Sequence, residues 1–472
     1  MYNSLTRRKK GAFMSKFHSG ISSSVIEGAL ASRTGRVHFV GVGGVGVYPL
    51  FVLLKGMGYS VSGSDSSCGE LVQELISSGE RVYIGSDIET VRTATLVVYS
   101  LAVRDDDPEI KIAEELGIPT ASRAELFGVI MRDYRVRVGI SGSHGKSTVT
   151  AMLDAILLSS GWDHTTVIGA RLADIASPLR AGGREYLVYE SCEYKDSFLR
   201  FSPTISVFNN LELDHVDYFS DIGAIKNSFL TAINSSPVSI INIEDENLAS
   251  LIPMAKRRVV TFGMGERADY AGRIKREAEG YSLSVFHRGG EAVSLHLSLF
   301  GQHNAMNALA AASAALTLGV SSDKIRDALE KFTLPERRLQ LISVTGGNRI
   351  YYDYAHHPTE IKASLSALRE RENMPVLAVF SPHTYSRTKA FKKEFCEALS
   401  LADRVLILPV SAIREEGIEG VSSAALASGI GKGAMAVTED EAFSVISALR
   451  GYCVVLMGAG DNRALREKFT PK

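Results

Sequence analysis

The sequence lacks the features of several protein classes. It has four cysteines in 472 residues, with no CxxC pair and no short disulfide spacing among them. This arrangement argues against a thiolate zinc site and fits a reducing compartment. Basic and acidic residues nearly cancel, with 52 Lys and Arg, 53 Asp and Glu, and a net charge of -1. We therefore expect no broad positive surface for nucleic acid or an anionic membrane, and any anion must be bound locally.

Long hydrophobic runs are also missing. The longest small-apolar run, residues 305–320, has 16 residues and contains Asn307, whereas a bilayer-spanning helix needs about 20 apolar residues. We expect a buried helix there. The first 33 residues are basic but lack the apolar segment of a signal peptide, so we expect a flexible extension in which Met14 could be an alternative start. These absences predict a soluble, cytoplasmic protein.

The chain does contain a repeating α/β pattern. Short apolar, β-branched runs alternate with helical patterns, which is typical of parallel sheets with crossover helices. The length predicts about three domains, and 45% hydrophobic content is ample for several cores. We place them at residues 34–132, 133–332 and 333–472. Within the second, residues 280–300 alternate apolar and polar side chains around Arg288-Gly289-Gly290, which predicts an antiparallel hairpin.

Two glycine-rich turns follow predicted strands about a hundred residues apart. The first has Gly41, Gly43 and Gly46 in the GxGxxG spacing, and Asp65 closes the next strand 19 residues after Gly46. Glycines there let the backbone approach a pyrophosphate at a helix N-terminus, while an acid can accept a ribose hydroxyl. The pattern predicts a nucleotide-binding turn. A tight turn without a ligand is the alternative.

The second turn reads GISGSHGKST from Gly139 and departs from Walker A spacing, because Ile140 stands where the first glycine belongs. Backbone N–H groups can surround phosphate oxygens, Lys146 can neutralise the β- and γ-phosphates, and the Ser147 hydroxyl can bind Mg²⁺. The two strands after the turn end near Glu190 and His215. Since strand ends converge at one sheet edge, we expect Ser147, Glu190 and His215 to meet at a metal.

These turns belong to a series of motifs that resembles the Mur ligase family of peptidoglycan synthesis: GISGSHGKST, YESCEYKDSFL, NNLELDHVDYF, GQHNAMNALAAA, PERRLQ, YDYAHHPTEI and FSPHTYSRTKAF. The resemblance extends from about Arg36 to the final strand. It implies a Rossmann-like N-terminal domain for the UDP-sugar, a central P-loop ATPase-like domain for ATP and Mg²⁺, and a Rossmann-like C-terminal domain that completes the ATP and amino-acid sites. The first turn would then hold substrate and the second would supply energy.

The resemblance also implies roles for individual residues. Lys146, Glu190, His215, Arg337 and His356 would be catalytic, and Ser147, Glu190 and His215 would ligate the metal. The ATP-binding residues would be Gly142, Ser143, His144, Gly145, Lys146, Ser147, Thr148, His303, Asn304, Asn307, Arg337 and Asp353, with Arg338 as a second candidate for the γ-phosphate. The substrate-binding residues would be Gly43, Gly44, Val45, Gly46, Ser64, Asp65, Ser100, Glu193, His383 and Arg387.

The sequence departs from the family pattern in three places. Tyr352 precedes Asp353 where relatives often have a second acid, so one ribose acid remains. Thr384 stands where some relatives have Arg, which affects how the lactyl carboxylate or the amino acid is clamped. Lys226 follows His215 at the wrong spacing for the carbamylated lysine of some members, and it is given no such role.

The motifs are most similar to those of the member that joins L-alanine to UDP-N-acetylmuramate through an acyl phosphate, acting as a monomer or homodimer. Three alternatives stay open. One is a ligase that attaches a murein tripeptide or another amine. The second is an NAD-dependent dehydrogenase built on the first turn, which leaves GSHGKST and ELDH without a role. The third is a catalytically silent nucleotide-binding or scaffold protein.

Overall fold

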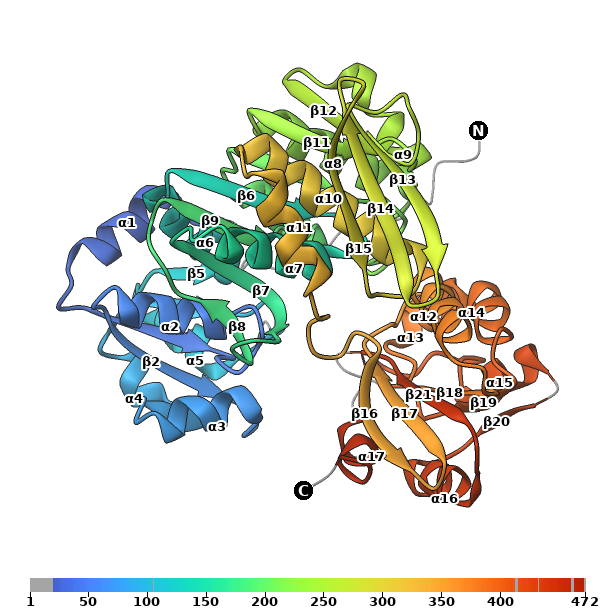
Figure 1. Ribbon diagram of the computed structural model, residues 1–472. Helices are drawn as coiled ribbons and strands as arrows, with labels where there is room; N and C mark the ends of the chain where they lie inside the picture. The colour runs from blue at the N-terminus through green and yellow to red at the C-terminus, as the bar shows by residue number, and fades with distance from the viewer. Residues whose placement is uncertain (1–19, 105, 412–414, 432, 460–461, 471–472) are drawn as a thin grey trace, which may run out of the picture. The chain divides into compact units, whose positions relative to one another are not determined.

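The computed structural model describes residues 20–104, 106–411, 415–431, 433–459 and 462–470 (Figure 1). The chain divides into two compact units between Arg132 and Asp133. The first unit contains one sheet and the second contains two. The three sheets are mostly parallel, as the α/β pattern predicts, and together they make a three-domain architecture.

The first unit is a five-stranded parallel sheet in the order β3-β2-β1-β4-β5, with helices in the connections. Its strands are β1 (Arg36–Val40), β2 (Ser60–Asp65), β3 (Val82–Ile84), β4 (Ala94–Tyr99) and β5 (Thr120–Ser122). Its helices are α1 (Ser23–Ala31), α2 (Tyr48–Gly56), α3 (Glu70–Ser77), α4 (Ile88–Val91), α5 (Pro108–Glu115) and α6 (Arg123–Ile130). The central strand β1 is buried on both sides, so the turn that follows it sits on a rigid base.

The predicted flexible extension over residues 1–33 is corrected in its last part. Residues 1–19 lie outside the described residues, but Ser23–Ala31 form helix α1. Ile26 and Leu30, four residues apart and therefore on one helix face, are buried, and α1 contacts α6. The Ile21 N–H donates to a Glu125 carboxylate oxygen at 3.1 Å. This short apolar pair was too weak a signal to predict a helix.

The middle of the chain forms a ten-stranded sheet in the order β15-β14-β13-β12-β11-β10-β6-β9-β7-β8. The strands are β6 (Val136–Ser141), β7 (His164–Leu172), β8 (Ser177–Arg180), β9 (Tyr186–Glu190), β10 (Ile205–Phe208), β11 (Val238–Asn242), β12 (Arg258–Gly263), β13 (Tyr270–Glu277), β14 (Gly280–His287) and β15 (Gly290–Leu297). The antiparallel β14–β15 hairpin turns at residues 288–289, which confirms the predicted hairpin.

Helices of this middle part pack on the sheet and enclose its core. They are α7 (Lys146–Ser159), α8 (Ile222–Ser235), α9 (Glu246–Ala249), α10 (Gln302–Leu318) and α11 (Ser322–Glu330). The alanine-rich α10 contacts α7 and strands β11 to β14, and most of its residues are buried, which confirms the predicted buried helix (Figure 1). Within the described part of the chain, none of the helices combines the length and apolar character of a membrane span.

The last part forms a six-stranded sheet in the order β16-β17-β21-β18-β19-β20, parallel except for the β16–β17 pair. Its strands are β16 (Gln340–Thr345), β17 (Asn348–Asp353), β18 (Val376–Phe380), β19 (Arg404–Ile407), β20 (Ala434–Ala436) and β21 (Cys453–Met457). Its helices are α12 (Pro358–Arg371), α13 (Tyr385–Ala390), α14 (Lys392–Leu399), α15 (Ser423–Ile430), α16 (Glu439–Ala448) and α17 (Arg463–Glu467). Separate apolar clusters cover its two faces.

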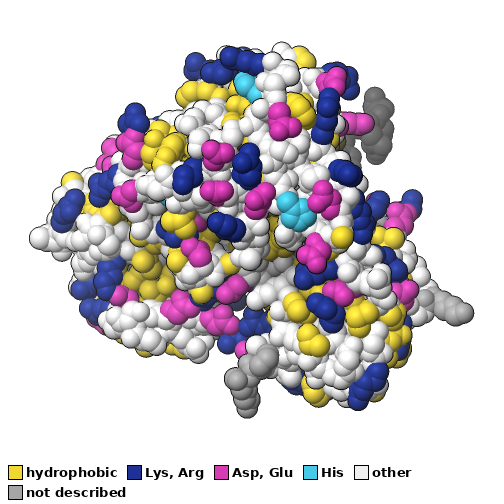
Figure 2. All heavy atoms as spheres, in the orientation of Figure 1, with side chains coloured by type: hydrophobic (Ala, Val, Ile, Leu, Met, Phe, Trp, Pro, Cys, Tyr) yellow, Lys and Arg dark blue, Asp and Glu magenta, His cyan; other side chains and the backbone are white. Residues whose placement is uncertain are grey.

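The surface agrees with the balanced composition. Positive and negative side chains are interspersed over the face that Figure 2 shows. All four cysteines lie within the described residues, and no disulfide joins any of them. Any anion site must therefore be built locally, from backbone N–H groups and a few cationic side chains.

Candidate functional site

The first glycine turn links β1 to α2 in the first unit. Gly41 has a φ of +75°, which favours glycine, and a Cβ added to Gly43 would lie 2.6 Å from Val72. The Gly43 N–H donates to an Asp65 carboxylate oxygen at 2.9 Å, so the acid predicted for the ribose lies directly beside the turn. The turn thus leads into α2 with one carboxylate beside it, and the Gly43 and Gly44 N–H groups are bonded within the protein.

Other residues predicted to bind substrate in this unit differ in accessibility. Val45 is exposed and Ser100 is half-buried next to the turn, 3.9 Å from a Cβ added to Gly44. Ser64 is buried, and its hydroxyl donates to Glu109 at 2.5 Å. Glu109 also accepts the Asp87 N–H and contacts His38. Ser64 therefore belongs to a buried network beneath the turn.

The second glycine turn lies between β6 and α7 in the second unit. Gly142 has a φ of +142° and Gly145 a φ of +82°. A Cβ added to Gly145 would lie 2.5 Å from the Asn307 Oδ1 and 2.6 Å from the Asn209 Nδ2. Any other residue at this position would therefore clash with these side chains and would also strain the backbone. The Asn210 Oδ1 accepts the His144 N–H at 2.7 Å and fixes the loop shape.

Lys146, the first residue of α7, lies in a row of charges with Glu193 and His215. Its Nζ is 3.0 Å from the Glu193 Oε2, and the His215 Nε2 is 3.7 Å from the Glu193 Oε1. Burial opposes charge on the lysine, but Glu193 holds its pKa above the usual range. Glu193 is fully buried. This carboxylate therefore holds a lysine and a histidine together at the sheet edge.

Glu190 and Ser147 flank this row. Glu190 ends β9, and its carboxylate accepts the Gly169 N–H at 2.7 Å. Glu190 is close enough to Lys146 to raise the pKa of the lysine. The Ser147 hydroxyl is buried and lies 3.4 Å from the Arg338 Nη2. The sheet edge thus places two carboxylates near the Lys146 ammonium group, with the His215 imidazole beside Glu193.

The two neighbouring arginines occupy different surroundings. The Arg338 guanidinium reaches Ser147 and lies 3.9 Å from the Glu360 carboxylate. The Arg337 guanidinium instead covers the Tyr354 ring at 4.4 Å and the Tyr352 ring at 5.5 Å. Arg338, rather than Arg337, therefore faces the glycine turn in this structure.

A cavity of about 290 Å³ adjoins the second turn. It is lined by groups from several regions of the second unit, among them the turn, the ends of β10, β11 and β17, and the starts of α10 and α12. Residues predicted to bind ATP that line it are His144, Gly145, Thr148, His303, Asn304, Asn307 and Asp353. The structure therefore brings together residues that are more than two hundred positions apart in the sequence, in a cavity close to the size range of ligand pockets.

Two titratable groups of this cavity have shifted pKa values. Burial raises the pKa of Asp353 to about 6, although Arg338 and the Ala355 N–H favour the carboxylate. The Asp353 carboxylate also accepts the Leu339 N–H at 3.0 Å. Burial lowers the pKa of His303 to about 4, so its imidazole is neutral at pH 7. A neutral imidazole is suited to packing on an uncharged ring.

His356, His383 and Arg387 lie near one another at the ends of the C-terminal strands. The His356 and His383 rings are 6.5 Å apart, and burial lowers the pKa of His356 to about 4. The Arg387 Nη2 is 2.7 Å from the Asp214 Oδ1, and both residues are buried. Burial disfavours charge on Asp214, but Arg387 holds its pKa well below the usual range. Arg387 is thus held in place by a partner in the middle part of the chain.

Sequence reasoning missed several residues of the cavity wall. Asn209 and Asn210 follow β10 and hold the second turn by hydrogen bonds to His144. Glu212 and Glu360 flank the His144 imidazole at 3.3 Å on either side. Burial opposes charge on His144, yet Glu360 and Glu212 raise its pKa to about 10. The two consecutive asparagines at a strand end could have indicated a site, whereas nothing in the sequence around Glu360 indicated one.

This arrangement suits the binding and transfer of a phosphoryl group. Backbone N–H groups at the start of α7, Lys146 and Arg338 can hold phosphate oxygens, and the amides of Asn304 and Asn307 can meet a base. No side chain is needed as a covalent nucleophile, because positioning and charge stabilisation supply most of the catalysis in such reactions.

Three family models match the chain in order. They are the Mur ligase family catalytic domain over residues 36–135, the Mur ligase middle domain over residues 140–315 and the Mur ligase glutamate ligase domain over residues 337–460. Together they cover most of the chain and correspond to its three sheets.

Individual relatives agree with these matches. The chain is 37% identical over 437 residues to the UDP-N-acetylmuramate–L-alanine ligase of Caldicellulosiruptor bescii, covering 90% of this chain and 96% of the relative. It is 35% identical to the enzyme of that name from Aquifex aeolicus, covering 93% and 98%. The crystal structure of UDP-N-acetylmuramate–alanine ligase from Thermotoga maritima superposes with a TM-score of 0.79 at 26% identity, covering 92% and 98%.

Proposed function

The chain belongs to the Mur ligase family, and we propose that it joins L-alanine to the carboxylate of UDP-N-acetylmuramate while ATP is cleaved to ADP and phosphate. The observation that carries this function is the second turn, where Lys146, Glu193 and Arg338 surround the start of α7 beside the cavity. The activity named for the relatives agrees with it.

The first turn would bind the pyrophosphate of the sugar nucleotide. The N–H groups of Val45 and Gly46, just before α2, would hold phosphate oxygens, because the helix dipole stabilises anions there. Gly43 and Gly44 would line the turn and let the pyrophosphate approach. Asp65 would accept a ribose hydroxyl, because its carboxylate already lies beside the turn. Ser100 would contact the substrate from the neighbouring strand end, whereas Ser64 would support the turn from beneath.

ATP would lie in the cavity beside the second turn. The N–H groups of residues 142–148 and Lys146 would hold its phosphates, Asn304 and Asn307 its adenine, and Asp353 its ribose. The donor set also fits Mg²⁺, which prefers oxygen ligands with one or two carboxylates. Ser147 and Glu190 would hold the ion with His215, and when bound it supplies charge neutralisation on the β- and γ-phosphates.

The first chemical step activates the carboxylate. A muramyl carboxylate oxygen attacks the γ-phosphorus, the bond from that phosphorus to the bridging oxygen breaks, and ADP leaves with the electron pair. Lys146 and Arg338 stabilise the charge on the transferring phosphoryl group. We assign this role to Arg338 because its guanidinium reaches Ser147, whereas that of Arg337 lies on tyrosine rings.

The second step forms the amide. The neutral amine of L-alanine attacks the acyl carbon, the bond between carbon and the phosphate oxygen breaks, and inorganic phosphate leaves. His356 would take the amine proton on Nε2, because its Nδ1 is 3.0 Å from the Tyr354 carbonyl oxygen and the ring is neutral at pH 7. Arg387 and His383 would face the carboxylate of the amino acid, with Arg387 oriented by Asp214.

The test is phosphate release by the purified protein. We expect release that requires ATP, UDP-N-acetylmuramate and L-alanine together, with UDP-N-acetylmuramoyl-L-alanine as the product. Turnover with a murein tripeptide and none with L-alanine would reassign the amine and leave the phosphoryl chemistry intact. NADH binding without ATP cleavage would contradict the function altogether. The residues that line the cavity all come from one chain. We propose that the enzyme acts as a monomer or a homodimer, and that it acts in the cytoplasm.

A further inference from the structure

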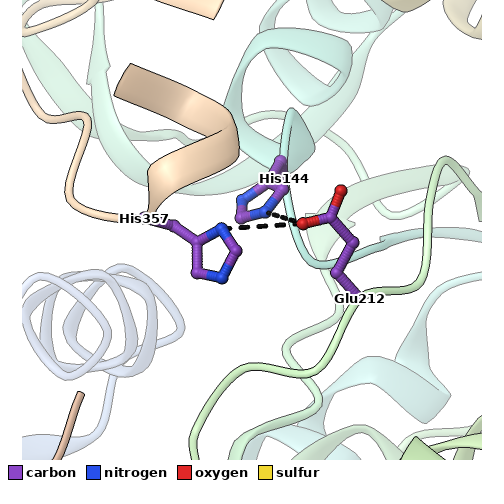
Figure 3. A group of neighbouring side chains, drawn as sticks. All are labelled: His144, Glu212 and His357. Carbon is purple, nitrogen blue, oxygen red and sulfur yellow. Dashed lines mark hydrogen bonds and ion pairs between the residues drawn. The ribbon is translucent and has the colours of Figure 1, made fainter. Parts of the chain in front are cut away.

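We propose that His144, Glu212 and His357 form a second cation site, for a divalent transition metal of the zinc class, separate from the magnesium ligands proposed above. The three residues come from different segments: the second turn, the loop after β10 and the residue before α12 (Figure 3). In Figure 3 both imidazole rings turn a nitrogen toward one Glu212 carboxylate oxygen.

The spacing of the three side chains fits a tetrahedral metal. The His144 Nε2 is 3.3 Å and the His357 Nδ1 is 3.6 Å from the Glu212 Oε2. Two ligands about 2.1 Å from a tetrahedral zinc ion lie about 3.4 Å apart. All three ligand atoms lie within 4.8 Å of one another. A side-chain rotation that releases the His357 Nδ1 from the Thr359 N–H, which it accepts at 3.4 Å, would bring the two nitrogens into position.

The surroundings also match those of protein metal ligands. A metal-bound histidine usually donates its other N–H to a carboxylate, which orients the ring. The His144 Nδ1 lies 3.3 Å from the Glu360 Oε1, so its second nitrogen has such a partner. The Thr359 hydroxyl donates to the Glu212 Oε2 at 2.7 Å and orients the carboxylate. The His144 ring is thus oriented by a carboxylate on each side.

The ligand types decide which cation fits. Two imidazoles and one carboxylate form the donor set of many three-ligand zinc sites, whereas Mg²⁺ prefers an octahedral oxygen shell. Glu212 and Thr359 line the nucleotide cavity, and with His357 they also line a neighbouring cleft. The cation can therefore enter from the cleft, and its fourth position stays open for water or another small ligand.

A cation there would join the second turn to the start of α12. His144 and Glu212 belong to the middle part of the chain, and His357 is the N-cap of α12 in the last part. Because both turn and helix also border the cavity, the ion would hold its two walls together and stabilise the protein by mass action.

The test uses Co²⁺ as a spectroscopic probe for the zinc class, added to the full-length protein with excess Mg²⁺ and no nucleotide. We expect saturable visible absorption typical of four-coordinate cobalt, abolished by stoichiometric Zn²⁺. Glu212→Gln and His357→Gln should each weaken binding by about 100-fold or more, since even residues that support metal ligands contribute about 10–100-fold. Thermal unfolding without metal checks that both variants are folded.

Two further variants locate the signal. His296→Gln removes a partly exposed histidine that lies 3.1 Å from Glu277, and it should bind cobalt like the wild type. His215→Ala removes a proposed magnesium ligand and should also keep the band. Loss of the band in His215→Ala with its retention in Glu212→Gln would overturn the proposal. So would absence of a band in the wild-type protein at a cobalt concentration equal to that of the chain.

Discussion

The two glycine-rich turns follow buried strands and open helices, yet different charged side chains lie beside them. The turn after β1 has an acid beside it, because the Gly43 N–H bonds to Asp65. The turn after β6 ends in Lys146, which pairs with Glu193, and Arg338 approaches from the last part of the chain. Two turns with similar backbones therefore present different charged side chains to the phosphates that each would bind.

The charged side chains beside each turn determine which phosphate chemistry it can support. Backbone N–H groups and a helix dipole bind a phosphate whose charge does not change during the reaction. A phosphoryl group in transfer needs cations that follow its developing charge. The Asp65 carboxylate suits a ribose hydroxyl, whereas the carboxylate beside the second turn, Glu193, is paired with the Lys146 ammonium group. The first turn is thus built to hold a substrate and the second to take part in the reaction.

The largest expected effect comes from removing the cation of the second turn. Lys146→Met should lower kcat for phosphate release by at least about 10²–10³-fold, because a preorganised charge contact in the transition state is lost. The variant leaves Glu193 buried without its lysine, so stability will fall too. The double variant Lys146→Met/Glu193→Gln should regain stability but not activity. Lys275→Ala, at an exposed position, should match the wild type.

The next largest effect separates glycines of the two turns. Gly145→Ala places a Cβ at a positive φ and against Asn307 and Asn209, which costs at least about 1–2 kcal/mol for the backbone alone. Gly46→Ala meets the flexible Arg123 side chain at 3.0 Å, which can move away. Thermal unfolding should show a clear loss for Gly145→Ala and little change for Gly46→Ala. Equal losses would mean that the turns are equally constrained.

The paired arginines test which cation reaches the transferred phosphate. Arg338→Ala should lower kcat by about 10²-fold, whereas Arg337→Ala should mainly destabilise the protein by about 0.5–1 kcal/mol for each tyrosine contact it loses. Steady-state kinetics and chemical unfolding of both variants separate the two effects. A larger loss of kcat in Arg337→Ala would reverse the assignment and restore the expectation from the sequence.

The acid of the first turn should affect one substrate alone. Asp65→Ala should raise KM for UDP-N-acetylmuramate by about 10-fold, because a hydrogen bond to a charged group contributes about 1.5–3 kcal/mol. KM for ATP should stay unchanged, since Asp65 belongs to the first turn. Kinetics with each substrate varied in turn measures both values. A parallel rise in KM for ATP would show that the two turns do not bind separate nucleotides.

The smallest effect is a dependence on pH. Burial raises the pKa of Asp353 from 3.8 to about 6, so the neutral acid is favoured in the folded protein. Its contribution to stability is present below the ordinary pKa and is lost as pH rises through about 6. ATP binding needs the carboxylate as an acceptor, so KM for ATP should fall a few-fold over the same rise. In Asp353→Asn, KM for ATP should no longer change over this pH range. A change that persists would come from another titrating group.

Much of the fold could be predicted from the sequence because buried parallel strands are continuous apolar runs. The strand before the second turn, β6, and the two that end near Glu190 and His215, β9 and β10, were predicted in this way. The edge pair β7–β8 was missed, since its residues mix polar, small and apolar types without alternation. Helix α1 was missed because its buried face consists of two apolar residues.

The site was predictable where the chemistry needs glycines, a lysine or strand-end acids. Lys146, His215 and Asp353 were predicted as site residues from their motifs, and these roles stay predictions. Asn209, Asn210 and Glu360 were not, because a polar residue after a strand or in the first turn of a helix has many roles, and only folding sets Glu360 beside His144. The choice between Arg337 and Arg338 likewise depends on how the backbone bends at Arg337, whose φ is +65°.

Transfer of isotope from the sugar acid to phosphate is a direct test of whether ATP activates the carboxylate. UDP-N-acetylmuramate labelled with ¹⁸O in its carboxylate would be turned over with ATP and L-alanine, and the released phosphate analysed by mass spectrometry. Attack by that carboxylate on the γ-phosphorus predicts that each phosphate carries a single ¹⁸O from the sugar acid. Unlabelled phosphate, formed while the amide product accumulates, would contradict activation of the carboxylate by ATP.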